Sequence, residues 1–311
     1  MKPSFYHWNS KARLDIRKAV SYMLISEVWG EFVQYKLLEE GRSEDTILKY
    51  HDCIKRFIGL EGDLEITEIR KEHLLDMRMK LKKLSVARVS SIIFCVRSLL
   101  RYCREEKEMS VIDPSLIKLP RRTRKEIIYL TNDEVKDFLA EIDITDIHGL
   151  RMRTLCELLL DTGARISEAL QLDRTSIRRE DGITFARVIG KGNKERKLFI
   201  SGRPMFWIEK YLETRTDSHP ALFVTHCEAK RLKKNGGTKD FKKIAKRAGI
   251  YKQVSPHIFR HTFCTNLLKN GAGMAQIQRL AGHEDISTTM KFYARLDDID
   301  LVAAKWKLSY E

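Results

Sequence analysis

The chain has 311 residues, enough for two globular domains, and 43% of them are hydrophobic, which excludes a wholly disordered protein. Its 58 Lys and Arg against 43 Asp and Glu give a formal charge of +15, which favours a polyanionic partner, nucleic acid before an anionic membrane surface. No apolar run resembles a secretory signal or could span a bilayer, so we expect a cytoplasmic protein without a membrane partner. The six cysteines are scattered singly, which favours free thiols over disulfides or a zinc finger.

The segment from about residue 26 to residue 108 has the spacing of amphipathic helices throughout. Four apolar stripes follow one another, and four such helices can bury their stripes against each other in a small bundle. The stripes are Val28, Phe32 and Tyr35; Ile47, Tyr50, Ile54, Phe57 and Ile58; Leu74, Met77, Leu81 and Leu84; and Val89, Ile92, Ile93, Val96, Leu100 and Cys103.

Residues 113–128 contain two prolines and the basic run 121–125, which predicts an extended linker between a domain at 1–112 and another at 129–311. The second domain opens with a capping box at Thr131 and Glu134. Basic side chains in both parts are candidate DNA contacts, although a solvated charged surface is an alternative meaning of each. These candidates are Arg88, Arg97, Arg101, Arg121, Arg122, Lys239, Lys242 and Lys243.

The second domain is predicted to be mainly helical with a small β-hairpin. Residues 183–189 and 197–200 are rich in β-formers, and the basic turn between them places Lys191 near the hairpin tip. Further along, a helix opening at Thr238 has one basic face, which could lie along a DNA groove or simply be solvated.

Three short motifs in this domain could carry chemistry. In the first, Gly163 ends one helix and the next begins at once, which places Arg165 beside a helix N-terminus. A guanidinium there presents a fork that suits a phosphate. A surface salt bridge to Glu168, three residues further on, is the alternative interpretation and, for this motif alone, the preferred one.

In the second motif, a serine followed by Pro256 starts a helix, on which His257, Arg260 and His261 share one face. Two histidines four residues apart could bind zinc. The metalloprotease pattern, however, requires Glu directly after the first histidine, and here that residue is Ile258, so we expect no metal.

The third motif spans residues 280–293. Gly282 ends a helix, His283 follows it, and Ser287 can cap a short helix that carries Tyr293. A lone tyrosine next to Phe292 is usually a core aromatic. Only the neighbouring motifs make this tyrosine a candidate nucleophile.

Together the motifs resemble the signature of the tyrosine recombinase (phage integrase) family, in the order and spacing of its Xer-like members. The resemblance covers about residues 131–294, and the helical N-terminal part resembles that family's core-binding domain. It implies a mainly α protein: a four-helix core-binding domain and a mainly helical catalytic domain with a small β-hairpin or sheet. Two small departures are Ala164 and Ala281, where many members carry leucine.

The resemblance implies a role for each motif residue. Arg165 and Arg260 would clamp the non-bridging oxygens of the scissile phosphate, and Tyr293 would attack it. His257 would act as the base, and Lys191 would protonate the leaving 5′-oxygen. No cofactor or metal is implied, because a 3′-phosphotyrosine stores the bond energy for religation. With His283, which would hydrogen-bond a phosphate oxygen, the implied catalytic residues are Arg165, Lys191, His257, Arg260, His283 and Tyr293.

The implied function is site-specific recombination by a homo-tetramer on double-stranded DNA with paired inverted-repeat core sites, in a prokaryotic cytoplasm and associated with the nucleoid. A C-terminal tail from about residue 297, anchored by Leu301, Val302 and Trp306, would dock on the neighbouring protomer. A type IB topoisomerase or telomere-resolving enzyme shares similar chemistry and is an alternative. A non-catalytic sequence-specific DNA-binding regulator is another, and a zinc hydrolase is a distant last.

Overall fold

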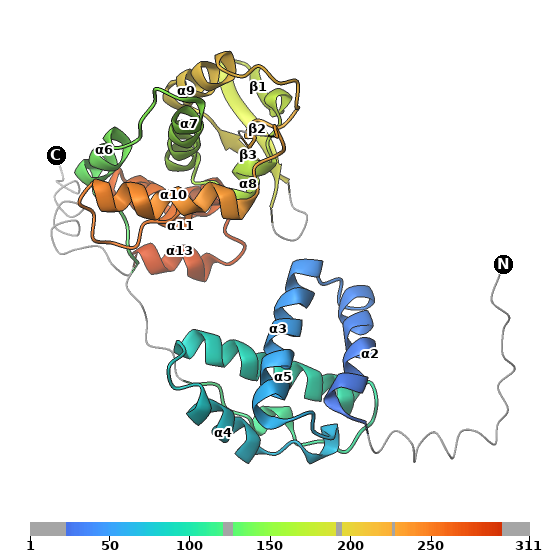
Figure 1. Ribbon diagram of the computed structural model, residues 1–311. Helices are drawn as coiled ribbons and strands as arrows, with labels where there is room; N and C mark the ends of the chain where they lie inside the picture. The colour runs from blue at the N-terminus through green and yellow to red at the C-terminus, as the bar shows by residue number, and fades with distance from the viewer. Residues whose placement is uncertain (1–22, 121–126, 191–194, 226–227, 294–311) are drawn as a thin grey trace, which may run out of the picture. The chain divides into compact units, whose positions relative to one another are not determined.

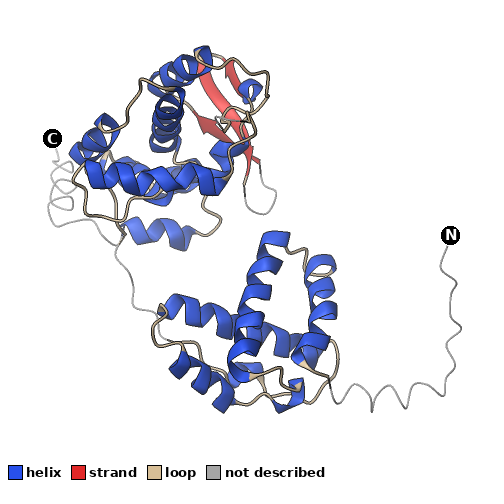
Figure 2. Cartoon of the chain, in the orientation of Figure 1, coloured by secondary structure: helices blue, strands red, loops and turns tan. Residues whose placement is uncertain are grey.

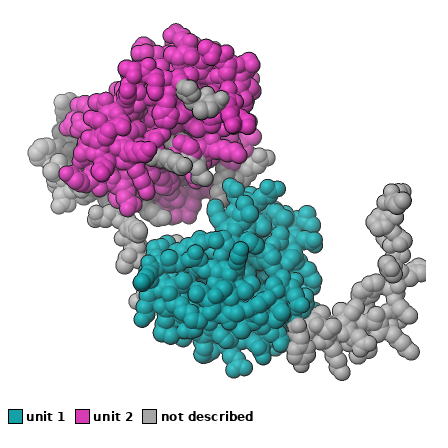
Figure 3. Space-filling view, in the orientation of Figure 1, with its two compact units in different colours: residues 1–124 teal, residues 125–311 magenta. Residues whose placement is uncertain are grey.

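The computed structural model describes residues 23–120, 127–190, 195–225 and 228–293. The chain divides into two compact units, Met1–Arg124 and Lys125–Glu311, each with a hydrophobic core of its own (Figure 3). Among the described helices, none combines the length and the apolar character that crossing a membrane requires. The architecture is mainly helical with one small antiparallel sheet in the second unit (Figure 2), as the sequence predicts.

The first unit is built on the four predicted amphipathic helices. Phe32, Phe57, Met77 and Val96, one from each stripe, are completely buried, because the helices cover each other's apolar faces. Its elements are α2 (Ile25–Leu38), α3 (Glu44–Glu61), the short 3-10 helix η2 (Ile66–Glu68), α4 (Lys71–Lys80), α5 (Val86–Glu105) and the 3-10 helix η3 (Pro114–Leu116) (Figure 1).

The beginning of the expected linker is packed rather than extended. The Asp113 carboxylate accepts a hydrogen bond from the backbone N–H of Ser115 (2.8 Å) and caps η3. Pro114 is buried, and Ile117, 4% exposed, packs against the first core, because both side chains are apolar enough to extend it. Residues 121–126 lie outside the described part of the chain.

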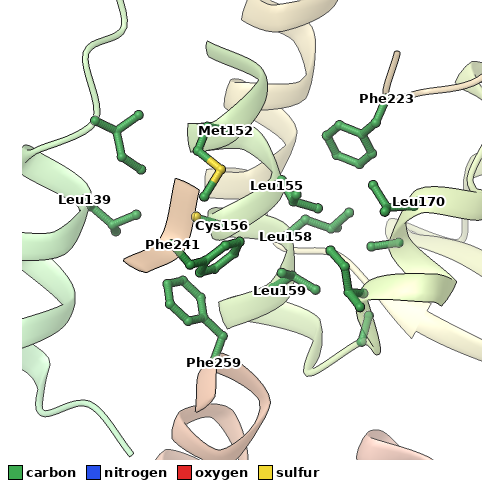
Figure 4. Close-up of a cluster of buried hydrophobic side chains, with 14 of the residues drawn as sticks. Leu139, Met152, Leu155, Cys156, Leu158, Leu159, Leu170, Phe223, Phe241 and Phe259 are labelled. Atoms are coloured by element: carbon green, nitrogen blue, oxygen red, sulfur yellow. The ribbon is translucent and has the colours of Figure 1, made fainter. Parts of the chain in front are cut away.

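The second unit is organised around α7, which is buried on most sides. Before it, the predicted capping box is present: the Glu134 N–H donates to Thr131 Oγ1 (3.2 Å), and the Thr131 N–H donates to Glu134 Oε2 (2.8 Å). Figure 4 shows α7 side chains pointing among the aromatic rings of later helices. Labelled members of this cluster are Leu155, Cys156, Leu158, Leu159, Phe241 and Phe259. The helices are α6 (Asn132–Ala140), α7 (Ile147–Thr162), α8 (Ile166–Gln171), η4 (Arg174–Ser176), α9 (Gly202–Glu213), α10 (Lys234–Arg247), α11 (Pro256–Lys269), α12 (Met274–Ala281) and α13 (Ile286–Tyr293).

The sheet has the strand order β1-β2-β3 and is antiparallel throughout. The predicted hairpin is formed by β2 (Ile183–Ile189) and β3 (Glu195–Phe199), while β1 (Ile177–Glu180) was not expected from its short, charged sequence. Arg196 pairs with Val188 across the hairpin, and it shares a strand face with the buried Leu198 because side chains alternate along a strand.

Two helices begin elsewhere than predicted. Helix α10 starts at Lys234, four residues before Thr238, so its first turn includes two glycines whose weak helix propensity the surrounding packing overrides. Helix α13 starts at Ile286, which places Ser287 inside it. The capping carboxylate is that of Asp285, whose Oδ1 accepts a hydrogen bond from the Ser287 N–H (2.8 Å).

Candidate active site

Arg165 lies at the N-terminus of α8, directly after the turn that ends α7. Gly163 makes this turn with φ +60°, and a Cβ there would lie 2.2 Å from the Phe263 ring, so both conformation and space require glycine. The Arg165 guanidinium donates from Nη1 to Glu168 Oε1 (2.7 Å) and from Nη2 to the carbonyl oxygen of Gly282 (3.0 Å). The salt bridge considered as an alternative is therefore present, but Glu168 is buried rather than at the surface.

The carboxylate of Glu168 has a second arginine partner that was not predicted. Arg196 of β3 donates from Nη2 to Glu168 Oε2 (2.8 Å) and from Nη1 to the carbonyl oxygen of Leu280 (2.6 Å). Burial alone would raise the pKa of Glu168, but its hydrogen bonds with Arg196 and Arg165 lower that pKa below its ordinary value, so the group is a carboxylate at neutral pH. The one sequence signal that could have pointed to Arg196 is its position two residues before the apolar Leu198, which places both side chains on one face of a strand.

Arg260 is a buried cation directed at the same turn. It is 3% exposed on α11, which begins at Pro256 as predicted. Its Nη1 donates to the carbonyl oxygen of Gly163 (2.7 Å), whereas its buried Nη2 has no hydrogen-bond partner within the described part of the chain. Burial, followed by the charge of Arg165, lowers the pKa of Arg260 to about 10. A bound anion would stabilise this buried guanidinium, because it would supply both an opposite charge and a hydrogen-bond acceptor.

Two histidines of α11 flank Arg260. His257 is exposed, and its ring lies against that of His261, with ring centroids 4.8 Å apart. Partial desolvation by the neighbouring groups, followed by the charges of Arg260 and Arg165, lowers the pKa of His257. His261 Nδ1 lies 3.1 Å from the carbonyl oxygen of Ile128. No described group of three or more His, Cys, Asp or Glu side chains could hold a metal ion.

His283 comes from the turn after α12. Gly282 makes this turn with φ +66°, and a Cβ there would lie 2.6 Å from Arg196 Cδ. The His283 ring stacks on Phe292, with centroids 6.2 Å apart and planes at 8°, and its Nδ1 lies 2.9 Å from Thr289 Oγ1. If the buried Thr289 hydroxyl donates this bond, Nε2 carries the imidazole proton and can donate it to a phosphate oxygen.

Tyr293 is the last residue of α13, and its side chain lies outside the described atoms. The helix packs against α11 and α12 (Figure 1). Its Phe292 side chain is 6% exposed and contacts the rings of both His261 and His283. The backbone that carries Tyr293 therefore runs beside the histidines of the cluster.

The structure thus brings together the predicted Arg165, His257, Arg260 and His283. Lys191 lies outside the described residues. However, Gly190, which directly precedes it, lines a cavity of about 320 Å³ together with Arg165, Gly282 and His283. The described end of the hairpin therefore reaches the cluster.

The candidate DNA contacts are distributed over both units. In the first, Arg88 pairs with Asp52, Arg101 lies 3.9 Å from Glu105, and Arg97 is half-buried. In the second, Lys242 and Lys243 are exposed on α10. The backbone of Lys239 lies in the same helix but its side chain is outside the described atoms, and Arg121 and Arg122 fall in the undescribed 121–126 segment. DNA contact remains a prediction for each.

Two arginines and neutral imidazoles around a helix N-terminus have the charge and the hydrogen-bond donors that suit a phosphate ester, as in enzymes that transfer phosphoryl groups. Residues 129–299 match the phage integrase family. The tyrosine recombinase XerD of Staphylococcus epidermidis is 33% identical over 278 residues, covering 84% of this chain and 92% of that protein. XerD of Oceanobacillus iheyensis is 32% identical over 287 residues, covering 86% and 95%. The chain belongs to the phage integrase family and is a tyrosine recombinase.

The fold agrees with this assignment. The Tn1549 transposon integrase, solved in complex with transposon right end DNA, superposes with a TM-score of 0.73 at 17% identity, covering 93% of this chain and 100% of that one. The XerH site-specific recombinase, solved in a post-cleavage complex with its palindromic difH substrate, gives a TM-score of 0.70 at 21% identity, covering 84% and 80%. At these identities the likeness establishes the architecture.

The position of His283 among cations predicts how stability depends on pH. Burial, followed by the charges of Arg260, Arg165 and Arg196, lowers the pKa of His283 from 6.5 to about 4. Between these two values the unfolded chain binds a proton that the folded chain does not, so the free energy of unfolding should fall as the pH drops from 6.5 to about 4. Urea unfolding at several pH values should show this fall to be smaller in His283→Asn. Parallel pH curves would contradict the prediction.

Proposed function

We propose that this recombinase is site-specific and breaks and rejoins DNA through a covalent 3′-phosphotyrosine, acting as a tetramer on two paired sites. The observation that supports this most directly is the buried Nη2 of Arg260, a donor that has no hydrogen-bond partner among the described residues and lies beside Arg165 and close to His257 and His283. A backbone phosphate placed there would give the buried cation an anion. It would also lie next to the chain segment that carries Tyr293.

The proposed step is an in-line displacement at phosphorus. The Tyr293 oxygen forms a bond to phosphorus, the bond from phosphorus to the 5′-oxygen breaks, and the 3′-phosphate stays on the tyrosine. His257 receives the phenol proton, which it can do at neutral pH because its lowered pKa keeps the imidazole neutral. Lys191 supplies a proton to the leaving oxygen. Arg165 and Arg260 neutralise the charge on the non-bridging oxygens, for which their planar forks are suited.

The test is a nicked suicide substrate, in which cleavage releases a short strand that diffuses away, so the covalent complex accumulates. A recombinase should form an adduct that survives denaturation without added metal or nucleotide. Two marked DNA sites should then exchange flanking sequences, whereas relaxation or hairpin formation alone would indicate topoisomerase or telomere-resolving activity. Specific binding without any adduct would indicate a non-catalytic regulator.

Assembly through the tail, whose residues lie outside the described part of the chain, is tested separately. Ending the chain after Arg295 removes the proposed anchors Leu301, Val302 and Trp306. We expect protomer assembly on paired sites to weaken at least about tenfold, because buried aromatic anchors carry much of an interface's energy, while binding of one protomer changes little. Native gel mobility at increasing protein concentration measures both steps. Unchanged assembly would refute the role of the tail.

A further inference from the structure

Arg196 connects three segments of the second unit through one side chain that is only 12% exposed. It extends from β3 and donates from Nη2 to Glu168 Oε2 in α8, at 2.8 Å. Its Nη1 donates to the carbonyl oxygen of Leu280 in the last turn of α12, at 2.6 Å. A single guanidinium therefore fixes the distance between the start of α8 and the end of α12.

These bonds form part of a closed ring that includes Arg165. The second oxygen of Glu168 accepts a hydrogen bond from Arg165 Nη1 (2.7 Å), and Arg165 Nη2 donates to the carbonyl oxygen of Gly282 (3.0 Å). Gly282 follows Leu280 by two residues. Two groups hold the Arg165 guanidinium, the Glu168 carboxylate and the turn at Gly282. Arg196 donates a hydrogen bond to the first and packs against the second.

The stem of Arg196 also packs against the turn that precedes His283. A Cβ at Gly282 would lie 2.6 Å from Cδ and 2.7 Å from Nε of Arg196, so the two residues are in close contact. The buried Nε has no hydrogen-bond partner within the described residues. Burying this Nε without a partner costs desolvation free energy, which the hydrogen bonds from Nη1 and Nη2 must offset.

We propose that Arg196 is a positioning residue for strand cleavage, which holds the Arg165 guanidinium through Glu168 and the turn at Gly282 through Leu280. The inference rests on the proposed function, because it assigns Arg196 to the same phosphate site. Arg196 does not touch the phosphate; it sets where Arg165 meets it. A shift of about 1 Å in such a group can reduce a rate up to about 100-fold.

The test compares Arg196→Met and Arg196→Lys with the control Arg187→Met. Arg187 lies on the neighbouring strand β2, is exposed, and pairs at 3.1 Å with Glu195. On a nicked suicide substrate, Arg196→Met should cleave about 10- to 100-fold more slowly than the wild type with DNA affinity nearly unchanged, as is typical when the support of a reacting group is lost. Arg196→Lys should recover only part of the rate, because one ammonium cannot replace a bidentate fork. Arg187→Met should cleave normally.

A modified phosphate separates positioning from a general loss of folding. Replacing one charged non-bridging oxygen of the scissile phosphate by methyl gives a neutral methylphosphonate, which depends less on cations. The deficit of Arg196→Met relative to the wild type should shrink on this DNA by on the order of tenfold, as should that of Arg165→Ala. A 5′-bridging sulfur, which leaves without a proton, should not reduce the deficit.

The outcomes are distinct. An equal deficit on phosphate and methylphosphonate DNA, or a normal rate of Arg196→Met on both, would overturn the positioning role. Rescue by the bridging sulfur would overturn it as well, since the defect would then lie in protonation of the leaving oxygen. If the wild-type protein itself forms no adduct on any of these substrates, the proposed function fails rather than this inference alone.

Discussion

Tyr293→Phe should bind its DNA site with wild-type affinity and form no covalent adduct. The substitution removes one oxygen at the end of α13 and leaves the ring, so we expect the free energy of unfolding to change by less than about 0.5 kcal/mol. Loss of a nucleophile, in contrast, should reduce cleavage at least about 10⁴-fold. A denaturing gel with end-labelled suicide substrate measures the adduct, and a native gel measures binding.

The linkage can also be located directly in the wild-type adduct. Trypsin cuts after lysine and arginine, here after Lys291 and Arg295. The DNA should therefore keep a four-residue peptide in which Tyr293 is the only hydroxylated side chain. Tyr251→Phe is the matched control, since Tyr251 is a fully exposed tyrosine of the same unit, between α10 and α11. An adduct formed by Tyr293→Phe would assign the nucleophile to another residue.

The parts of the site that the sequence predicted are those whose local motifs fix both residue and backbone. A glycine directly after a helical stripe commonly ends the helix in the left-handed conformation, so Gly163 and Gly282 could be predicted as the turns that precede Arg165 and His283. Likewise, the proline at the first position of α11 marks where this helix begins, so the positions of His257, Arg260 and His261 along the helix could be predicted. The amphipathic stripes of the first unit were predictable for the same local reason.

What escaped prediction depends on contacts between distant segments. Arg196 reads as one more charge in a basic turn until the fold places Glu168, 28 residues earlier, within hydrogen-bonding distance. Glu168 itself reads as a surface partner at i+3, because burial is a property of the packed unit and not of the helix. The packing of Ile117 against the first core was hidden for the same reason, behind a proline-rich and basic composition.

Arg260→Met should lose cleavage without losing stability. The lowered pKa of Arg260 indicates that the charged guanidinium is held unfavourably in the free protein, because the cation is buried near Arg165. Methionine fills similar space and removes this penalty, while the lost bond to the Gly163 carbonyl costs about 1 kcal/mol. We therefore expect the free energy of unfolding to stay level or rise by about 1–2 kcal/mol. Cleavage should fall about 10³-fold or more, as when a phosphate clamp is removed.

Arg151→Met is the control that separates a functional arginine from a structural one. Arg151 is also buried in the second unit, but its guanidinium is satisfied by the protein: Nη1 donates to the Val224 carbonyl oxygen (2.5 Å), and Nη2 lies 2.7 Å from His148 Nδ1. Its loss should lower the free energy of unfolding by about 1–3 kcal/mol, because buried partners are left unpaired. The folded fraction should cleave at the wild-type rate. If Arg260→Met is instead the destabilised variant and retains cleavage, Arg260 belongs to the core, and the phosphate must bind elsewhere.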